Sequence, residues 1–197
     1  MLTMPSNGKR LDATLEHFRN QGVEEPAPFH GIDGEAAGLD TRFPYQVDVP
    51  GTAFKISPRT IGIHLGHMLL WKVCQYQPVQ RFLIFEDDAR FVPGWHDAYV
   101  KGMAALPGDW DLLYLGSCCC AGRGAKQIDN TPLHRVTYAL CLHAYGVRSK
   151  ALETLWNACQ RIYAGVDIAI ALHAMDKLKA YAFLPRLFDQ DKTEIPP

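Results

Sequence analysis

Three consecutive carboxylates, Glu86, Asp87 and Asp88, follow directly after the apolar residues 82–85. Charges of the same sign this close together repel one another unless solvent, a basic partner or a metal ion compensates them. Mg²⁺ and Mn²⁺ favour oxygen ligands and keep coordination positions open for water and for the phosphates of a substrate. This acidic trio therefore predicts either a divalent-metal site that activates a phosphate leaving group or a solvated acidic turn, and its three residues alone do not separate the two.

Histidines and cysteines are the other residue types here that suit metal binding. His64 and His67 stand three positions apart and could share one helix face, although no acidic third ligand is near them in the sequence. His143 and His173 could reach a metal from later segments, but a lone histidine more often has a structural role. The cysteines lack a metal-finger spacing, and without a secretion signal we expect reduced thiols that pack as small hydrophobic side chains. The six cysteines are Cys74, Cys118, Cys119, Cys120, Cys141 and Cys159.

The composition fits one compact enzyme-like domain. The chain has 197 residues, 48% of them hydrophobic, and its 20 basic and 21 acidic residues give a formal charge of −1. No positive field would gather nucleic acid or anionic lipid. Pro5, Lys9 and Arg10 interrupt the region where a signal peptide would need an apolar core, and no later run has membrane-spanning length. We therefore expect a cytoplasmic protein, at most peripheral to the inner membrane surface.

Hydrophobic periodicity predicts the elements that position these residues. Helical periods are found over residues 10–21, 58–76, 96–106, 149–163 and 166–178, and Ser57 with Pro58 suits a helix start. Residues 82–85 and 111–116 read as fully buried strands, and residues 134–147 as one or two strands. Residues 42–52 show no helical period and are expected to be mobile. Alternating strands and helices predict an α/β fold with a mainly parallel central sheet flanked by helices, and ligand sites at the carboxyl ends of strands.

Four motifs occur in an order that is typical of one enzyme family. A G-x-I-G-C-x-x-S-H-x-x-L-W element reads RTIGIHLGHMLLW here, with Ile63 and Gly66 at the cysteine and serine positions. An apolar strand ending in E-D-D reads LIFEDDARF, and a W-D-x-x-Y-L-G strand reads WDLLYLG. Later in the chain, an A-Y-x-x-S/R segment reads HAYGVRSK, and an I/V-D pair is present as Val166 and Asp167. A final P-x-x-x-x-Q pattern runs from Pro185 to Gln190. Over about residues 10–190 the chain resembles glycosyltransferase family 25, of the lipopolysaccharide-biosynthesis type that is also similar to the collagen galactosyltransferases.

This resemblance implies a GT-A architecture in which the acidic trio acts as the D-x-D-type motif. It implies a single domain over residues 1–197, with a nucleotide-sugar half of about 1–120 and an acceptor half of about 121–197. It further implies inverting transfer of galactose or glucose from a UDP-sugar to a saccharide acceptor. Asp88 is the first candidate ligand for Mn²⁺ or Mg²⁺, Asp87 is the second, and Glu86 would face the ribose or the metal waters.

Further site residues follow from the same resemblance. Arg10 would face the nucleotide phosphates, and Gly62 and His67 would belong to the donor site. Inversion needs a carboxylate that accepts the proton of the attacking hydroxyl, and the candidates are Asp167 and Asp111. Each of these aspartates also suits a capping position, so both interpretations stay open. Trp71 and Trp110 are expected to pack in the core.

Two other functions remain open at the level of the sequence. A metal-dependent phosphohydrolase would also place carboxylates at a strand end, although neither a D-x-D-x-T/V pattern nor a P-loop is present. A non-catalytic descendant would bind a nucleotide sugar or a partner protein without turning it over. Neither the acceptor nor the oligomeric state is predicted.

Overall fold

A computed structural model of the chain describes residues 1–39, 56–118 and 124–192. The segment 42–52 that was expected to be mobile, together with Cys119 and Cys120, lies outside the described residues. Within the described ranges, no helix combines the length and the hydropathy that crossing a membrane requires.

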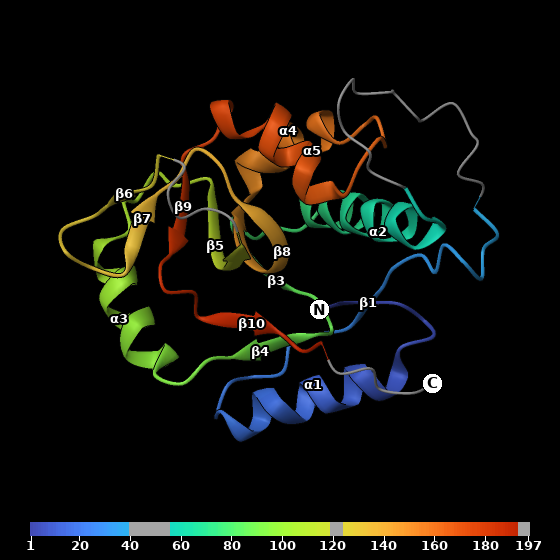
Figure 1. The fold of residues 1–197 in the computed structure, drawn as a ribbon, viewed down its shortest axis with the longest axis horizontal. Coiled ribbons are helices and arrows are strands. Elements are labelled where there is room, and N and C mark those ends of the chain that lie inside the picture. The colour runs from blue at the N-terminus through green and yellow to red at the C-terminus, as the bar shows by residue number, and fades with distance from the viewer. Residues whose placement is uncertain (40–55, 119–123, 193–197) are drawn as a thin grey trace.

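A six-stranded sheet runs through the centre of the molecule in the order β3, β8, β5, β9, β7, β6 (Figure 1). In this sheet β5 and β9 run parallel, and the other four neighbouring pairs are antiparallel. The α/β class is thus confirmed, but the expected mainly parallel sheet is not what the structure shows. The bounds are β3 Arg81–Phe85, β5 Leu112–Cys118, β6 Lys126–Gln127, β7 Leu133–Arg135, β8 Leu140–Arg148 and β9 Ala180–Phe183.

Two short pairs of strands extend this framework towards the acidic trio. β1 (Leu2–Thr3) pairs in parallel with β2 (Phe29–His30), and Leu2 also forms a parallel bridge with Glu86. β4 (Ala89–Phe91) pairs antiparallel with β10 (Phe188–Gln190). These pairings bring the first residues of the chain and its last described strand to both sides of the trio.

Helices cover both faces of the sheet (Figure 1). α2, α4 and α5 pack on one face, and α1 and α3 lie on the other, with β4 and β10 next to α1. The side chain of Ser57 accepts a hydrogen bond from the Thr60 amide and Pro58 opens α2, which confirms the predicted helix start. The predicted helices over 149–163 and 166–178 are shorter and each includes a 3₁₀ turn. The bounds are α1 Gly8–Asn20, α2 Pro58–Gln75, α3 Trp95–Ala105, η1 Ser149–Ala151, α4 Leu152–Ala158, α5 Val166–His173 and η2 Met175–Lys177.

The core lies on both sides of β5. Leu112 and Tyr114 point into the cluster under α2, α4 and α5, whereas Leu113 and Leu115 point into the cluster that contains residues of α1 and packs against α3. Such a strand has no solvated face, which is why its sequence is continuously apolar. β3 differs because it lies at the edge of the sheet: Leu83 is 56% exposed, so the prediction of a fully buried strand was wrong there.

A disulfide joins Cys118 at the end of β5 to Cys141 in β8, with a Cα–Cα distance of 5.8 Å. The prediction of reduced thiols was therefore wrong for this pair. The physical reason is the antiparallel register of the two strands, which places Cys118 opposite Leu140, the neighbour of Cys141. Cys74 and Cys159 are free and buried, as small hydrophobic side chains are expected to be.

Candidate functional site

The acidic trio lines a pocket at the carboxyl end of β3, next to the N-terminal strand β1. Its volume is about 180 Å³, and four separate segments of the chain contribute to its walls. The lining residues are Leu2, Thr3, Met4, Asn7, Arg10, Arg59, Ile63, Glu86, Asp87, Asp88 and Gln190. We call this cavity the acidic pocket. The carboxyl end of a strand is where the α/β pattern predicted a ligand site.

Glu86 is oriented by a chain of buried hydrogen bonds. Its Oε1 lies 3.0 Å from Nε2 of His67, and Nδ1 of His67 lies 3.0 Å from the hydroxyl of Tyr145. The indole nitrogen of Trp71 donates to the same hydroxyl at 2.8 Å. The Glu86 carboxylate can only accept, so Nε2 of His67 carries the proton of their hydrogen bond. In neutral His67, Nδ1 is then an acceptor, and the Tyr145 hydroxyl donates to it while accepting from the Trp71 indole. His67, predicted as a donor-site residue, is buried behind Glu86 and donates to it.

The surroundings keep Glu86 charged. Burial acts to raise its pKa, but the hydrogen bond from His67 and the electrostatic interactions with His67, His143 and Arg59 outweigh it, so the pKa lies below its ordinary value. With 22% of the side chain exposed, the carboxylate can still meet a ligand. Glu86 therefore offers a fixed negative charge at the pocket wall.

Asp87 connects the pocket to the N-terminal segment. Its Oδ2 accepts hydrogen bonds from the hydroxyl of Thr3 at 2.7 Å and from the amide of Asn7 at 3.2 Å. Its backbone carbonyl accepts one from the hydroxyl of Thr14 on α1. The side chain is buried, and Oδ2 already holds two protein donors. Asp87 thus stabilises the position of β1 and α1 against the acidic trio.

Asp88 is the member of the trio whose hydrogen bonding is incomplete. Its Oδ2 accepts a hydrogen bond from the side-chain amide of Gln190 at 3.2 Å, while Oδ1 is buried and has no partner among the described residues. Burial, followed by the charges of Glu86 and Asp87, raises the pKa of Asp88 to about 7, although the nearby Arg10 opposes this. A buried carboxylate oxygen without a donor is what a bound cation would complete.

The residues present fit a divalent cation only if a ligand or water completes its shell. Within the described residues, no three histidine, cysteine or acidic side chains gather into a metal-binding group. His64, the other half of the two-histidine alternative, is buried and bonds the carbonyls of Cys159 at 2.8 Å and Ala164 at 3.3 Å. A cation held by Asp88 would need substrate oxygens and water for its remaining positions, as is common for Mg²⁺ in phosphate sites.

The two candidate bases lie in different parts of the molecule. β3 and β5 run in the same direction. Glu86 follows the carboxyl end of β3 and Asp111 precedes the amino end of β5, so the two residues lie at opposite ends of the strands. Asp111 accepts from the amide of Lys179 at 2.8 Å and pairs with Lys150. Asp167 accepts from the amides of Cys141 at 3.0 Å and Ile168 at 2.9 Å. Neither aspartate lines the acidic pocket.

The other predicted residues divide between the pocket and the scaffold. Arg10 lines the acidic pocket. Gly62 does not line it; a Cβ there would lie 2.3 Å from the carbonyl oxygen of Ile32, so this glycine lets α2 pack closely on the chain before it. His143 is buried and its Nε2 lies 3.1 Å from the carbonyl of Phe188, while His173 lines a different cavity. The expectation that Trp71 and Trp110 pack in the core is confirmed.

Several pocket residues were not identified as site residues from the sequence. Thr3 and Asn7 carry no recognisable signal, because Thr3 lies on a strand of only two residues and Asn7 precedes α1 without a side-chain capping hydrogen bond. Arg59 opens the RTIGIHLGHMLLW element and Gln190 closes the P-x-x-x-x-Q pattern, so both had a signal in the motifs themselves. Their position at the site depends on the tertiary structure, which brings α2 and β10 beside Asp88.

Sequence comparison relates the chain to one group of proteins. A glycosyltransferase 25 family member of Anopheles gambiae is 30% identical over 141 residues, 66% of this chain and 23% of that protein. Procollagen galactosyltransferase 2 of Mus musculus is 26% identical over 125 residues, 59% and 20% of the two chains. The inactive glycosyltransferase 25 family member 3 of Homo sapiens is 26% identical over 156 residues, 74% and 24%. The chain spans less than a quarter of the length of these relatives. No family model matches it.

Proposed function

We propose that this chain, which belongs to the glycosyltransferase 25 family, transfers galactose or glucose from a UDP-sugar to a saccharide acceptor, with inversion and with the help of a divalent cation. The observation that carries the proposal is the buried Oδ1 of Asp88, which has no donor among the described residues and lies beside two further carboxylates. A site with this arrangement gains most from a ligand that brings positive charge.

The residues of the acidic pocket have separate tasks in this proposal. Asp88 would hold Mn²⁺ or Mg²⁺, and Glu86, fixed by His67, would accept hydrogen bonds from the ribose or from metal-bound water. Arg10 and Arg59 supply guanidinium groups that can pair with phosphate oxygens. The cation, when bound, supplies neutralisation of the charge on the departing diphosphate without a proton transfer.

Asp167 remains our candidate for the general base. Asp111 is separated from Glu86 by the length of the strands. Asp167 stands on the first turn of α5, which packs against α2 and β8. Two backbone amides hold its carboxylate in one orientation. A carboxylate held in one orientation is what a general base needs in order to accept a proton from an attacking hydroxyl.

A non-catalytic role is the second candidate. Human family member 3 is described as inactive, and it matches 74% of this chain. Asp167 also supports a non-catalytic role, because both of its carboxylate oxygens already accept backbone hydrogen bonds, as in a purely structural cap. A chain of this kind would bind the nucleotide sugar without turnover. Release of UDP from UDP-galactose or UDP-glucose separates the two: measurable turnover excludes the non-catalytic role.

Ligand-induced stabilisation tests the proposed site directly. A ligand at 100 times its dissociation constant stabilises the native state by about 2.7 kcal/mol. We expect UDP with Mn²⁺ to raise the melting temperature of the protein by several degrees, and UDP with EDTA to raise it much less. In Asp88→Asn the effect of Mn²⁺ should disappear, whereas Asp97→Asn, at an exposed position on α3, should behave like the unchanged protein. Equal melting temperatures under all conditions would contradict the proposal.

A further inference from the structure

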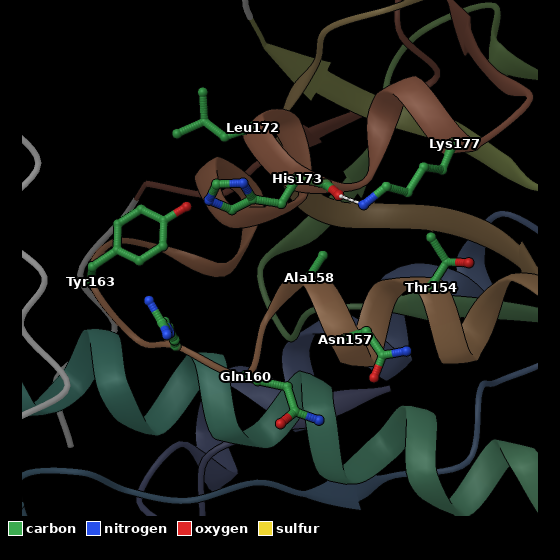
Figure 2. A pocket seen from close by; sticks show the side chains of 9 residues that line it. Thr154, Asn157, Ala158, Gln160, Tyr163, Leu172, His173 and Lys177 are labelled. Atoms are coloured by element: carbon green, nitrogen blue, oxygen red, sulfur yellow. Dashed lines mark hydrogen bonds between the residues drawn. The ribbon is translucent and has the colours of Figure 1, made fainter.

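A second and larger cavity lies between α4 and α5, in the helical layer (Figure 2). Its volume is about 730 Å³, within the range of small-molecule sites. In the described part of the chain, its walls share no residue with the acidic pocket. We call it the helical-layer pocket. Nothing in the proposed transfer reaction uses it.

The charged groups of the helical-layer pocket are basic. Arg161 and Lys177 line it together with the imidazole of His173, and no carboxylate lines it among the described residues. The ammonium of Lys177 donates to the carbonyl of His173 at 3.0 Å, which occupies one of its three donors and leaves two for a ligand. A guanidinium and an ammonium in the lining of one cavity favour a ligand that carries a carboxylate or a phosphate.

Tyr163 adds a hydroxyl whose hydrogen bonding is incomplete. Its oxygen is buried without a partner among the described residues, and burial raises the pKa of this phenol, so the group stays a donor. Figure 2 shows the hydroxyl pointing toward the ring of His173, and the two rings are 5.6 Å apart in an edge-to-face arrangement. His173 is exposed at the end of α5, so a change of its rotamer would open the hydroxyl to a ligand acceptor.

Neutral polar groups complete the lining on a fixed part of the backbone. Asn157 and Gln160 line the cavity from the end of α4 and from the segment after it (Figure 2). The ring nitrogens of buried His64 on α2 lie 2.8 Å from the carbonyl of Cys159 and 3.3 Å from that of Ala164, on both sides of the segment that carries Gln160 and Tyr163. Contact with this buried ring at both ends limits the movement of the segment, so its side chains are positioned before a ligand binds.

We propose that the helical-layer pocket binds an acidic saccharide, that is, a sugar with a carboxylate or a phosphate group. Arg161 and Lys177 would pair with the anion. Asn157 and Gln160 can each donate and accept, as neighbouring sugar hydroxyls require, and Tyr163 would donate to a ligand oxygen. This binding needs neither UDP nor a cation, so it is independent of the proposed transfer reaction.

Binding of simple sugars to the whole chain tests the proposal. Isothermal titration in EDTA compares methyl β-glucuronide and glucose 6-phosphate with methyl β-glucoside and inorganic phosphate. We expect at least one acidic sugar to bind roughly tenfold more tightly than the neutral sugar and than phosphate alone, since hydrogen bonds to charged groups contribute more than those between neutral groups. The two acidic probes distinguish a uronic acid from a sugar phosphate.

Variants tie this binding to the pocket. Arg161→Gln should lower the affinity for the acidic sugar roughly tenfold, and Tyr163→Phe should lower it several-fold. The control variants Lys101→Gln and Tyr76→Phe, at exposed positions, should leave this affinity unchanged. Tyr163→Phe removes a hydroxyl without a described partner, so it should melt no lower than the unchanged protein. Equal affinity for the neutral sugar, absence of binding, or binding that UDP displaces and Arg161→Gln leaves intact would each overturn the proposal.

Discussion

Glu86 and Asp88 stand two residues apart, yet their surroundings shift their pKa values in opposite directions. Burial acts to raise both, but Glu86 receives a hydrogen bond from His67, whereas Asp88 meets the charges of Glu86 and Asp87. Pairs of carboxylates with pKa values driven apart are common at functional sites. The divergence comes from His67, whose tautomer depends on Tyr145 and Trp71.

The raised pKa of Asp88 predicts a pH-dependent stability in the absence of a cation. Between about pH 4 and the folded-state value of about 7, the native state retains a proton that the unfolded chain releases. The contribution of Asp88 is therefore complete below about pH 4 and is lost as the pH rises through about 7. Each pKa unit is worth about 1.4 kcal/mol, so the change is a few kcal/mol at most. Denaturant unfolding in EDTA at several pH values measures it.

Asp88→Asn is the matched comparison for this prediction. The amide has nearly the same shape and cannot titrate, so the difference in unfolding free energy between the two proteins should change steadily from pH 4 to 7. A difference that is constant over this interval would show that Asp88 has an ordinary pKa. Titration of Glu86 is present in both proteins and does not produce the same trend.

At the level of single residues, the sequence predicted the acidic trio as a site because charge after an apolar strand is a local signal. The family resemblance ranked Asp88 first and Asp87 second as metal ligands and turned Glu86 toward the ribose, but the sequence did not give the hydrogen-bond partners that fix each carboxylate. Those partners include Thr3, Asn7 and Gln190, which come from distant parts of the chain and reach the trio only through β1 and β10. Local spacing holds no information on such partners.

The elements themselves were more predictable than their directions. Helical periodicity located α1, α2 and α3 to within a few residues, and the apolar run located β5. Hydrophobic patterns are the same for a strand that runs up or down a sheet, so the antiparallel placement of β8 between β3 and β5 was missed. The disulfide was missed for the same reason, since it depends on that register.

The link between β5 and β8 predicts a measurable stabilisation. The cysteines are 23 residues apart, and closing a loop of this length in the unfolded chain contributes about 3 kcal/mol in the chain-entropy model. We expect the double variant Cys118→Ser, Cys141→Ser to lose about this amount in denaturant unfolding. Dithiothreitol should lower the unfolding free energy of the unchanged protein to that of the double variant, and it should not change the unfolding free energy of the variant. If the reductant changes neither protein, the two thiols are not bonded in solution.

At the scale of the whole molecule, the two proposed halves are joined in one sheet. β3 and β5 belong to residues 1–120, but their shared neighbour β8 and the other neighbour of β5, β9, come from the second half. The apolar faces of β5 are likewise covered from both halves. A donor half and an acceptor half can therefore be functional regions without being separate folding units.

This topology predicts the outcome of dividing the chain after residue 120. The fragment 1–120 leaves both edges of β5 unpaired and exposes Leu112 and Tyr114, so it should show neither cooperative thermal unfolding nor dispersed amide resonances. The intact chain should unfold in one transition. Mixing the fragments 1–120 and 121–197 should restore part of the native spectrum, because β5 then regains β8 and β9. A fragment 1–120 that unfolds cooperatively on its own would instead make the nucleotide-sugar half an independent domain, and the acidic pocket would then form without Gln190.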